Sequence, residues 1–195
     1  MIGKVIKTLN NFYIDMMTQR TFLGGRIVSI DGRETTYDTV STGYDIAELI
    51  FFKYYPLNEN DVIVDVGCGK GRVFNYLLYK GLKNKMLGYE INPLVAEATQ
   101  KNLTRYKNVE IIGRNIFDEF PVDANVFYMF NPFKQTMMLE FKENILKMAD
   151  KKPVILYYNP TCIEVFNDKR FSYKLIDVPI LFFGLPYKLA IIKMV

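Results

Sequence analysis

The chain has 195 residues, of which 50% are hydrophobic, 15% aromatic and 24% charged, and it contains no histidine. This length and composition predict a single folded domain, because no linker-like, low-complexity stretch divides the sequence. Without histidine, a Ser-His-Asp triad, a Cys-His pair and an H-E-x-x-H zinc site are all excluded. The net charge of +4 is spread along the chain, whereas nucleic-acid binders usually concentrate their basic residues in a stripe.

Cysteine usage and hydropathy indicate the cellular setting. Cys68 and Cys162 lie far apart, and the sequence has no C-x-x-C pair. The longest apolar run near the C-terminus, residues 178–187, is broken by two prolines and a glycine, and a membrane helix needs roughly 20 apolar residues. The first residues do not resemble a signal peptide. We therefore expect a cytoplasmic protein with no transmembrane segment and no metal site.

Residues 1–40 are predicted to form an extension of the same domain. Apolar residues recur at helical spacing from Ile2 to Met16, which indicates an amphipathic helix whose apolar face packs on the domain. A membrane surface or a partner helix is the alternative for that face. An Asp-Gly turn between two β-rich runs predicts a hairpin over residues 26–37. We expect this extension to contribute to a lid on the acceptor side of a pocket.

From residue 41 onward, predicted helices and strands alternate. The predicted helices cover residues 45–55, 73–79, 93–106 and 135–149. The predicted strands, mostly short β-branched and aromatic runs, cover residues 62–66, 85–90, 109–112, 124–130, 153–158, 171–178 and 187–194. Alternation at this spacing predicts an α/β fold with a Rossmann-like, doubly wound and mostly parallel sheet of seven strands. No helix separates the last two strands, so we expect an antiparallel pair that closes one edge.

Candidate functional residues follow the predicted strands, where ligands of open α/β sheets bind. After the first strand, Asp65 precedes Gly67, Gly69 and Gly71, and glycine lets a backbone turn sharply and approach a ligand closely. This G-x-G-x-G spacing differs from the G-x-G-x-x-G fingerprint of dinucleotide-binding proteins. The carboxylate of Asp65 would repel a pyrophosphate, but it suits a ligand that carries an ammonium group.

The second and third strands are followed by residues suited to a nucleoside. Glu90 ends the second strand, where a carboxylate can accept hydrogen bonds from both hydroxyls of a ribose. Asn115 follows the third strand and can present its carbonyl oxygen to an adenine amino group. Ile116 or Phe117 would then cover the face of the ring. A helix cap or a solvent-facing acid is the alternative for Glu90, and a turn residue is the alternative for Asn115.

The fourth strand leads into Asn131-Pro132-Phe133. A proline biases the residue before it toward an extended conformation, so we expect Asn131 to direct its side-chain and backbone oxygens into the pocket. Phe133 offers a flat face for stacking or for a cation–π contact. A simple turn after a strand is the alternative.

Together these residues resemble the motifs of the class I S-adenosylmethionine-dependent methyltransferases, and the resemblance covers residues 40–195. It implies S-adenosyl-L-methionine as the cofactor, with Asp65 and the glycine-rich turn holding the methionine part. It also implies that Glu90 binds the ribose, that Asn115 and Ile116 bind the adenine, and that a segment ending at Tyr44 lies over the cofactor. The implied cofactor-binding set is Tyr44, Asp65, Gly67, Cys68, Gly69, Gly71, Arg72, Glu90, Ile91, Asn115, Ile116 and Asn131.

The Asn131-Pro132-Phe133 run is similar to the Asn/Asp-Pro-Pro-Tyr/Phe motif of amino-group methyltransferases, with one proline in place of two. This similarity implies that Asn131, Pro132 and Phe133 are the catalytic residues and that the acceptor is a nitrogen of a small molecule or protein side chain. The absence of histidine agrees with this hypothesis, because a hydroxyl acceptor would normally need a general base. An RNA- or DNA-directed methyltransferase, a non-catalytic binding protein and a NAD(P)-binding oxidoreductase remain as alternatives.

Overall fold

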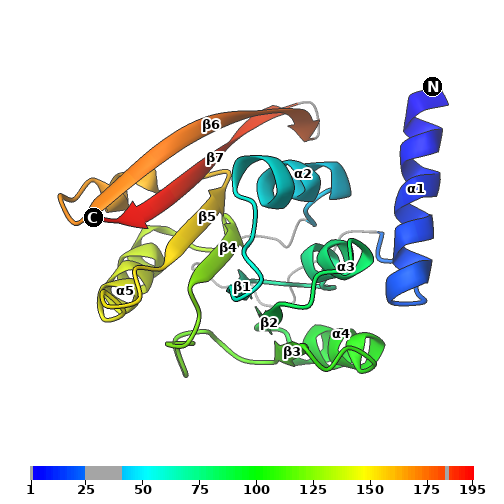
Figure 1. Ribbon diagram of the computed structural model, residues 1–195, viewed down its shortest axis with the longest axis horizontal. Helices are drawn as coiled ribbons and strands as arrows, with labels where there is room; N and C mark the ends of the chain where they lie inside the picture. Colours follow the sequence, from blue (N-terminus) through cyan, green and yellow to red (C-terminus); the bar gives the residue numbers. More distant parts are fainter. Residues whose placement is uncertain (1, 25–40, 183–184) are drawn as a thin grey trace.

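The computed structural model describes residues 2–24, 41–182 and 185–195 (Figure 1). Its seven strands are β1 (Val62–Val66), β2 (Lys85–Tyr89), β3 (Val109–Ile112), β4 (Val126–Phe130), β5 (Val154–Tyr158), β6 (Phe171–Phe182) and β7 (Leu185–Met194). Its helices are α1 (Ile2–Thr18), α2 (Tyr44–Glu48), α3 (Arg72–Tyr79), α4 (Pro93–Leu103) and α5 (Gln135–Leu146). The shorter helical segments are η1 (Leu49–Tyr54), a π-helical continuation of α2, and the 3₁₀ helix η2 (Ile163–Phe166). The predicted hairpin over residues 26–37 lies outside the described residues.

All seven strands form one sheet, in the order β3-β2-β1-β4-β5-β7-β6. Strands β1 to β5 are parallel, whereas β7 runs antiparallel to both β5 and β6. The strand order reverses between β1 and β4, and such a switch point opens a crevice at the carboxyl ends of the strands. The predicted doubly wound sheet with an antiparallel C-terminal pair is therefore confirmed.

Hydrophobic side chains cover both faces of the sheet, as expected for central parallel strands. Alternate residues of β1 face opposite layers, so Ile63 packs with α2, α3 and α4, while Val64 packs with α5. Asp65 follows Ile63 by two positions and faces the layer of α2 and α3. The alternation along β1 thus places a carboxylate near the start of α3.

The C-terminal strands are longer than the sequence predicts. β6 continues past residue 178 and through Pro179 to Phe182, with a shift in its pairing to β7 between Asp177 and Leu181. Proline cannot donate a hydrogen bond to a sheet, and it is tolerated on an edge strand or at an irregularity. Because β6 is the edge of the sheet, the proline does not end the strand.

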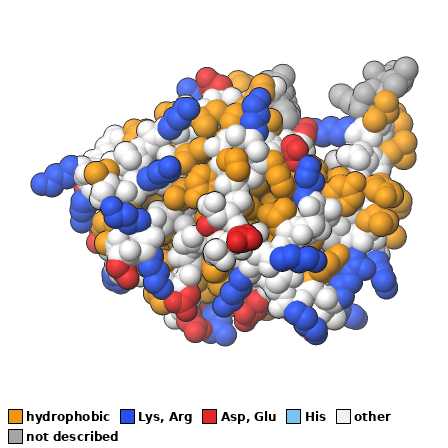
Figure 2. Space-filling view, in the orientation of Figure 1, with side chains coloured by type: hydrophobic (Ala, Val, Ile, Leu, Met, Phe, Trp, Pro, Cys, Tyr) orange, Lys and Arg blue, Asp and Glu red, His pale blue; other side chains and the backbone are white. Residues whose placement is uncertain are grey.

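Helix α1 packs on the domain in the opposite orientation to the predicted one. Its buried residues beside α3 are Ile14 and the polar Asp15 and Thr18, whereas most of its apolar residues face solvent (Figure 2). The apolar side chains of α1 that are 39–62% exposed are Val5, Ile6, Leu9, Phe12, Tyr13, Met16 and Met17. The prediction that the apolar face packs on the domain is wrong, because buried hydrogen bonds of Asp15 hold the polar face inward. No helix within the described ranges is both long and apolar enough to cross a membrane.

Candidate functional site

The turn between β1 and α3 depends on three glycines in the left-handed region. Gly67, Gly69 and Gly71 have φ angles of 80°, 52° and 70°, which residues with a Cβ adopt only with strain. A Cβ at Gly71 would also lie 3.0 Å from Cγ2 of Thr99 on α4. The G-x-G-x-G spacing therefore reflects a tight turn at the carboxyl end of β1, in which Gly67 is exposed and Gly69 and Gly71 are buried.

Contacts from two helices fix this turn. The Thr99 hydroxyl donates to the carbonyl of Gly69 at 3.0 Å, and Nε2 of Gln19, just after α1, donates to the carbonyl of Lys70 at 3.0 Å. The Lys70 ammonium group in turn donates to the carbonyl of Gly24 at 3.0 Å. The sequence pattern did not reveal these contacts, because they join segments up to 51 positions apart.

Two buried carboxyl groups lie beside the turn. Asp65 is 3% exposed and Glu90 is 5% exposed. Glu90 accepts hydrogen bonds from the backbone N–H of Gly69 at 3.0 Å and of Asn92 at 2.8 Å. Burial, and secondarily the charge of Glu90, raises the pKa of Asp65 to about 8. Burial also raises the pKa of Glu90, although its backbone donors oppose the shift, so the site is suited to a cationic group.

A cavity opens between the carboxyl ends of β1 and β4. Its walls are formed by Ser41, Thr42, Asp65, Gly67, Cys68, Arg72, Val73, Tyr128 and Phe130. The guanidinium of Arg72 lies 4.3 Å from the ring centroid of Tyr44, and its Nε and Nη2 are buried without a hydrogen-bond partner among the described residues. Unpaired buried donors are costly, so Arg72 is placed to bind an anionic group that enters the cavity.

The wall formed by β4 contains a residue pair that the sequence analysis missed. The hydroxyl groups of Thr42 and Tyr128 lie 2.6 Å apart, and both residues are buried. Tyr128 sits directly opposite Asp65 in the pairing of β4 with β1. Once these strands are recognised as neighbours, their register is the signal that identifies Tyr128 as a cavity residue.

Asn131 adopts a different conformation from the predicted one. Its φ is 45°, in the left-handed region, so the prediction of an extended residue is wrong. The side-chain Oδ1 accepts hydrogen bonds from the hydroxyls of Tyr157 at 2.8 Å and Thr161 at 2.6 Å. Asparagine tolerates the left-handed region better than most residues, and these two donors outweigh the bias imposed by the following proline.

The side chains of Pro132 and Phe133 pack against different parts of the domain. Pro132 lies against the glycine-rich turn, because a Cβ built on Gly67 would be 3.6 Å from its Cβ. Phe133 is 5% exposed and packs against Phe117 and Phe141, with ring centroids 5.3 and 5.9 Å away. The prediction that Phe133 offers a free ring face is therefore wrong, because its ring is buried in the hydrophobic layer under α5.

Tyr44 is held by contacts within the domain. It is 2% exposed, and its hydroxyl donates to Oδ1 of Asp15 and accepts a hydrogen bond from Nδ2 of Asn75 at 2.6 Å. The hydroxyl thus faces α1 and α3, away from the cavity, and a cofactor contact by Tyr44 stays a prediction. Its ring instead supports the guanidinium of Arg72.

The remaining predicted residues lie near the ends of β1, β2 and β3. Asn115 folds into a local turn in which its Oδ1 accepts from the N–H of Phe117 at 3.2 Å. Ile116 is 2% exposed, whereas Ile91 is 44% exposed. Cys68 has a buried free thiol. Their contacts with an adenosine group remain predictions, and no group of three or more Cys, Asp or Glu residues in the described part of the chain could hold a metal ion.

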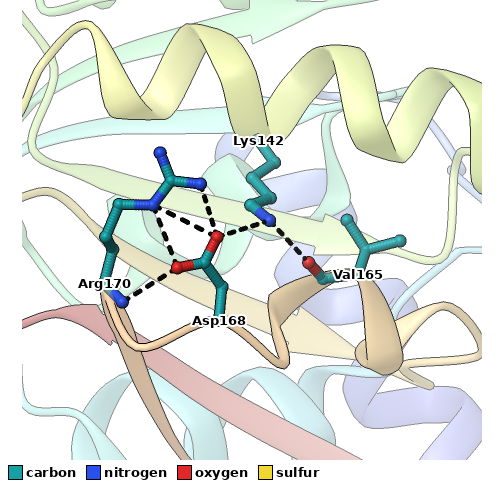
Figure 3. A network of polar contacts seen from close by, with 4 residues as sticks. All are labelled: Lys142, Val165, Asp168 and Arg170. Carbon is teal, nitrogen blue, oxygen red and sulfur yellow. Dashed lines mark hydrogen bonds and ion pairs between the residues drawn. The ribbon is translucent and has the colours of Figure 1, made fainter.

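The segment after β5 holds Thr161 against Asn131, and an ionic network that extends from buried Lys142 to exposed Arg170 anchors that segment (Figure 3). Lys142 of α5 forms an ion pair with Asp168 at 3.0 Å and donates to the carbonyl of Val165 at 3.1 Å. Arg170 binds the same carboxylate through its side chain and backbone. Hydrogen bonds from Arg170, together with Lys142, hold the pKa of Asp168 well below its usual range. The network thereby ties α5 to the loop beside Asn131.

Comparisons with known proteins place this geometry in context. No family model matches the sequence. A curated rRNA adenine N-6-methyltransferase from Limosilactobacillus reuteri is 36% identical over 66 residues, which represent 33% of this chain and 26% of that protein. The match therefore spans about a quarter of the length of that curated relative.

Solved structures match over much more of the chain. An RNA methyltransferase from Salinibacter ruber in complex with S-adenosyl-L-homocysteine has a TM-score of 0.58 at 15% identity, covering 80% of this chain and 94% of that one. A methyltransferase from Pyrococcus furiosus has a TM-score of 0.59 at 15% identity, covering 100% and 98%. A tRNA methyltransferase from B. subtilis has a TM-score of 0.57 at 12% identity, covering 76% and 63%. The chain has the fold of these methyltransferases.

Proposed function

We propose that this chain is an S-adenosylmethionine-dependent methyltransferase whose acceptor atom is a nitrogen. The observation that carries the proposal is the presence, in one cavity beside the glycine-rich turn, of a buried carboxyl group and of a guanidinium whose buried Nε and Nη2 have no hydrogen-bond partner among the described residues. An amino-acid moiety carries the complementary ammonium and carboxylate groups, whereas a pyrophosphate carries only negative charge. The fold agrees with this assignment.

The residues present fit the proposed cofactor. Asp65 binds the ammonium group and Arg72 the carboxylate of the methionine part. Glu90 keeps its two backbone hydrogen bonds and uses its remaining lone pairs for the ribose hydroxyls, since each carboxylate oxygen accepts more than one donor. S-adenosylmethionine supplies an activated methyl group when it is bound. The chain then needs to align the acceptor with that group and exclude water, and such alignment alone contributes up to about 7–11 kcal/mol.

Asn131 and Pro132 are the proposed alignment residues for the acceptor. Oδ1 of Asn131 already accepts two hydrogen bonds from protein hydroxyls. We assign alignment of the acceptor N–H groups to the backbone carbonyls of these two residues, with the Asn131 side chain fixing the loop. A neutral amine aligned in this way needs no general base, which suits a chain without histidine.

An RNA base is a second candidate for the acceptor. The curated match is named as an rRNA adenine methyltransferase, and two of the solved structures are named as RNA and tRNA methyltransferases. A base nitrogen satisfies the same chemistry as an amine of a small molecule or a protein side chain. The lid role of residues 1–40 stays a prediction, because residues 25–40 lie outside the described part of the chain.

Isothermal titration calorimetry with three ligands tests the cofactor assignment. S-adenosylmethionine and S-adenosylhomocysteine are expected to bind, and NAD is expected not to bind. Glu90→Ala should weaken binding by tenfold or more, because charge-assisted hydrogen bonds contribute about 1.5–3 kcal/mol. Glu97→Ala, at an exposed acid on α4, is the matched control. Binding of NAD alone would favour the oxidoreductase alternative.

The acceptor is identified by supplying methyl-labelled S-adenosylmethionine with total RNA, with protein extract or with a small-molecule extract, each in a separate reaction. Label in the RNA fraction that ribonuclease releases would assign RNA as the acceptor, and label in either of the other fractions would place the acceptor there. Hydrolysis of the labelled fraction and chromatography of the methylated product then show whether the methyl group lies on nitrogen, as proposed, or on oxygen. Asn131→Ala should lower labelling by about 100-fold, because the loop that carries the two backbone carbonyls loses its hydrogen bonds to Tyr157 and Thr161 and the acceptor is misaligned, while cofactor affinity should stay within about twofold. Cofactor binding without labelling of any fraction would instead support a non-catalytic binding protein.

A further inference from the structure

The orientation of α1 leaves a large apolar surface exposed. A surface helix of a globular protein normally turns its apolar stripe toward the core, but α1 buries Asp15 and Thr18 and leaves its apolar stripe in solvent. Phe22, just beyond the helix, is 56% exposed and extends the stripe through a ring contact with Phe12 at 6.2 Å. This surface is seen over α1 in Figure 2.

The size of this surface matches one side of a protein interface. An aromatic side chain has about 150–250 Å² of surface and an aliphatic or methionine side chain has less, so three aromatic and five smaller side chains, each about half exposed, present roughly 600–700 Å². The largest apolar patch on a typical monomer is about 300–600 Å², and a stable interface buries about 800 Å² per partner. The exposed stripe is thus larger than a monomer usually carries and close to the area that one side of a dimer interface buries.

The spacing along the stripe selects a helical partner. Ile6, Leu9, Tyr13 and Met16 follow one another at steps of three, four and three, which is the a/d spacing of helices that pack side by side. The order of these steps is the same from either end of the helix. An antiparallel copy therefore places Leu9 against Tyr13 of the partner subunit and Ile6 against Met16 of the partner subunit, in a self-complementary contact.

The charges on α1 argue against a membrane surface as the occupant. Helices that lie on membranes carry Lys and Arg along a solvated polar face. On α1 the polar residues near its end, Asp15 and Thr18, are buried against the domain, and Lys7 is paired with Asp45 of α2. We propose that a second copy of this chain covers the stripe, forming a two-fold dimer through antiparallel α1 helices.

Sedimentation velocity and light scattering on the full chain test the dimer. The expected mass is twice 22.8 kDa, and the Tm should rise with protein concentration because dissociation accompanies unfolding. Leu9→Glu should give a folded monomer with unchanged affinity for S-adenosylhomocysteine. Leu94→Glu, at a residue of α4 that is 69% exposed, should leave the dimer intact. A wild-type chain that stays monomeric at all concentrations overturns the proposal.

Disulfide crosslinking tests the antiparallel arrangement. Mixed Leu9→Cys and Tyr13→Cys chains should crosslink to each other faster than either variant crosslinks to itself, and the native Cys68 and Cys162 are buried. Faster self-crosslinking of Leu9→Cys overturns the antiparallel arrangement. A monomer that sediments with phosphatidylglycerol vesicles, and loses this property on Leu9→Glu, overturns the dimer in favour of a membrane surface. These outcomes do not depend on the methyltransferase assignment.

Discussion

Asp65 and Arg72 each occupy a position that is costly in the absence of a ligand. The carboxyl group of Asp65 is almost completely buried, which favours its protonated form, and Arg72 has buried donors without partners among the described residues. Groups of this kind cluster at functional sites because a ligand compensates for their burial. Their presence in one cavity supports binding of a zwitterionic group more strongly than the glycine-rich turn does alone.

Substitution of Asp65 by Asn tests this interpretation through the pH dependence of stability. The pKa of Asp65 is raised to about 8, so the folded protein retains a proton that the unfolded chain releases near pH 4. The stabilising contribution is therefore complete below the unfolded pKa and is lost as the pH rises through about 8, at about 1.4 kcal/mol per pH unit. Without cofactor, Asp65→Asn should unfold at a higher temperature than the wild type near pH 8.5.

The same comparison near pH 3.5, below the unfolded pKa, supplies the control, because Asp65 is then protonated in both the folded and the unfolded state and resembles asparagine in charge. The two Tm values should converge there in thermal denaturation followed by circular dichroism. A difference in Tm that is equal at both pH values would contradict the buried, proton-retaining carboxyl group. Saturating S-adenosylmethionine should stabilise the wild type more than Asp65→Asn, since only the wild type provides a carboxylate.

Among the structural elements, α1 and the residues just after it make the contacts that local sequence patterns predict least well. Its polar face binds the domain through Asp15, whose carboxylate accepts hydrogen bonds from the hydroxyl of Tyr44 and, at 3.0 Å, from the N–H of Leu23. Gln19, just beyond the helix, then contacts the glycine-rich turn. The N-terminal extension is thus connected to the candidate site through the hydrogen bonds of Asp15 and Gln19. These contacts are the same whichever partner covers its apolar face.

Asp15→Ala should therefore destabilise the whole domain. The substitution leaves the Tyr44 hydroxyl and the Leu23 N–H without a buried acceptor, and each unsatisfied group costs about 1–3 kcal/mol. A total loss of about 2–4 kcal/mol should lower the Tm by about 5–15 °C for a chain of this size. Asn10→Ala, at an exposed position of α1, should shift the Tm by less than about 2 °C. Equal Tm values for the two variants would contradict this role of Asp15.

Sequence periodicity predicted the sheet because its determinants are local. β-Branched runs such as Val62–Val66 and the glycines after it define strand and turn within a few residues. The periodicity of α1 likewise separates an apolar face from a polar one, but it does not determine which face docks. The conformation of Asn131 depends on hydroxyl groups 26 and 30 positions away, so no local rule could predict it.

At the scale of the whole molecule, the proposed ligand contacts several elements of the fold at once. The cavity combines the segment before α2 with the ends of β1 and β4 and the start of α3. A ligand held by all of them stabilises only the folded state. The structure therefore predicts a large thermal response to the cofactor product.

S-adenosylhomocysteine at 100 times its Kd should stabilise the protein by about 2.7 kcal/mol, which corresponds to a rise in Tm of about 5–11 °C. NAD at the same concentration should leave the Tm unchanged. Differential scanning fluorimetry measures both, with Glu90→Ala expected to reduce the response at a fixed ligand concentration. A shift produced by NAD and absent with S-adenosylhomocysteine would contradict the proposed ligand.

The strand order β5-β7-β6 has a consequence for how the polypeptide assembles during synthesis. β6 contacts the sheet only through β7, yet it leaves the ribosome first. Until β7 is made, β6 is a long edge segment with no strand to pair with, and such segments promote aggregation. We therefore expect the two strands to join the sheet together as a hairpin, and we expect a nascent chain stalled between them to aggregate more readily than the full chain.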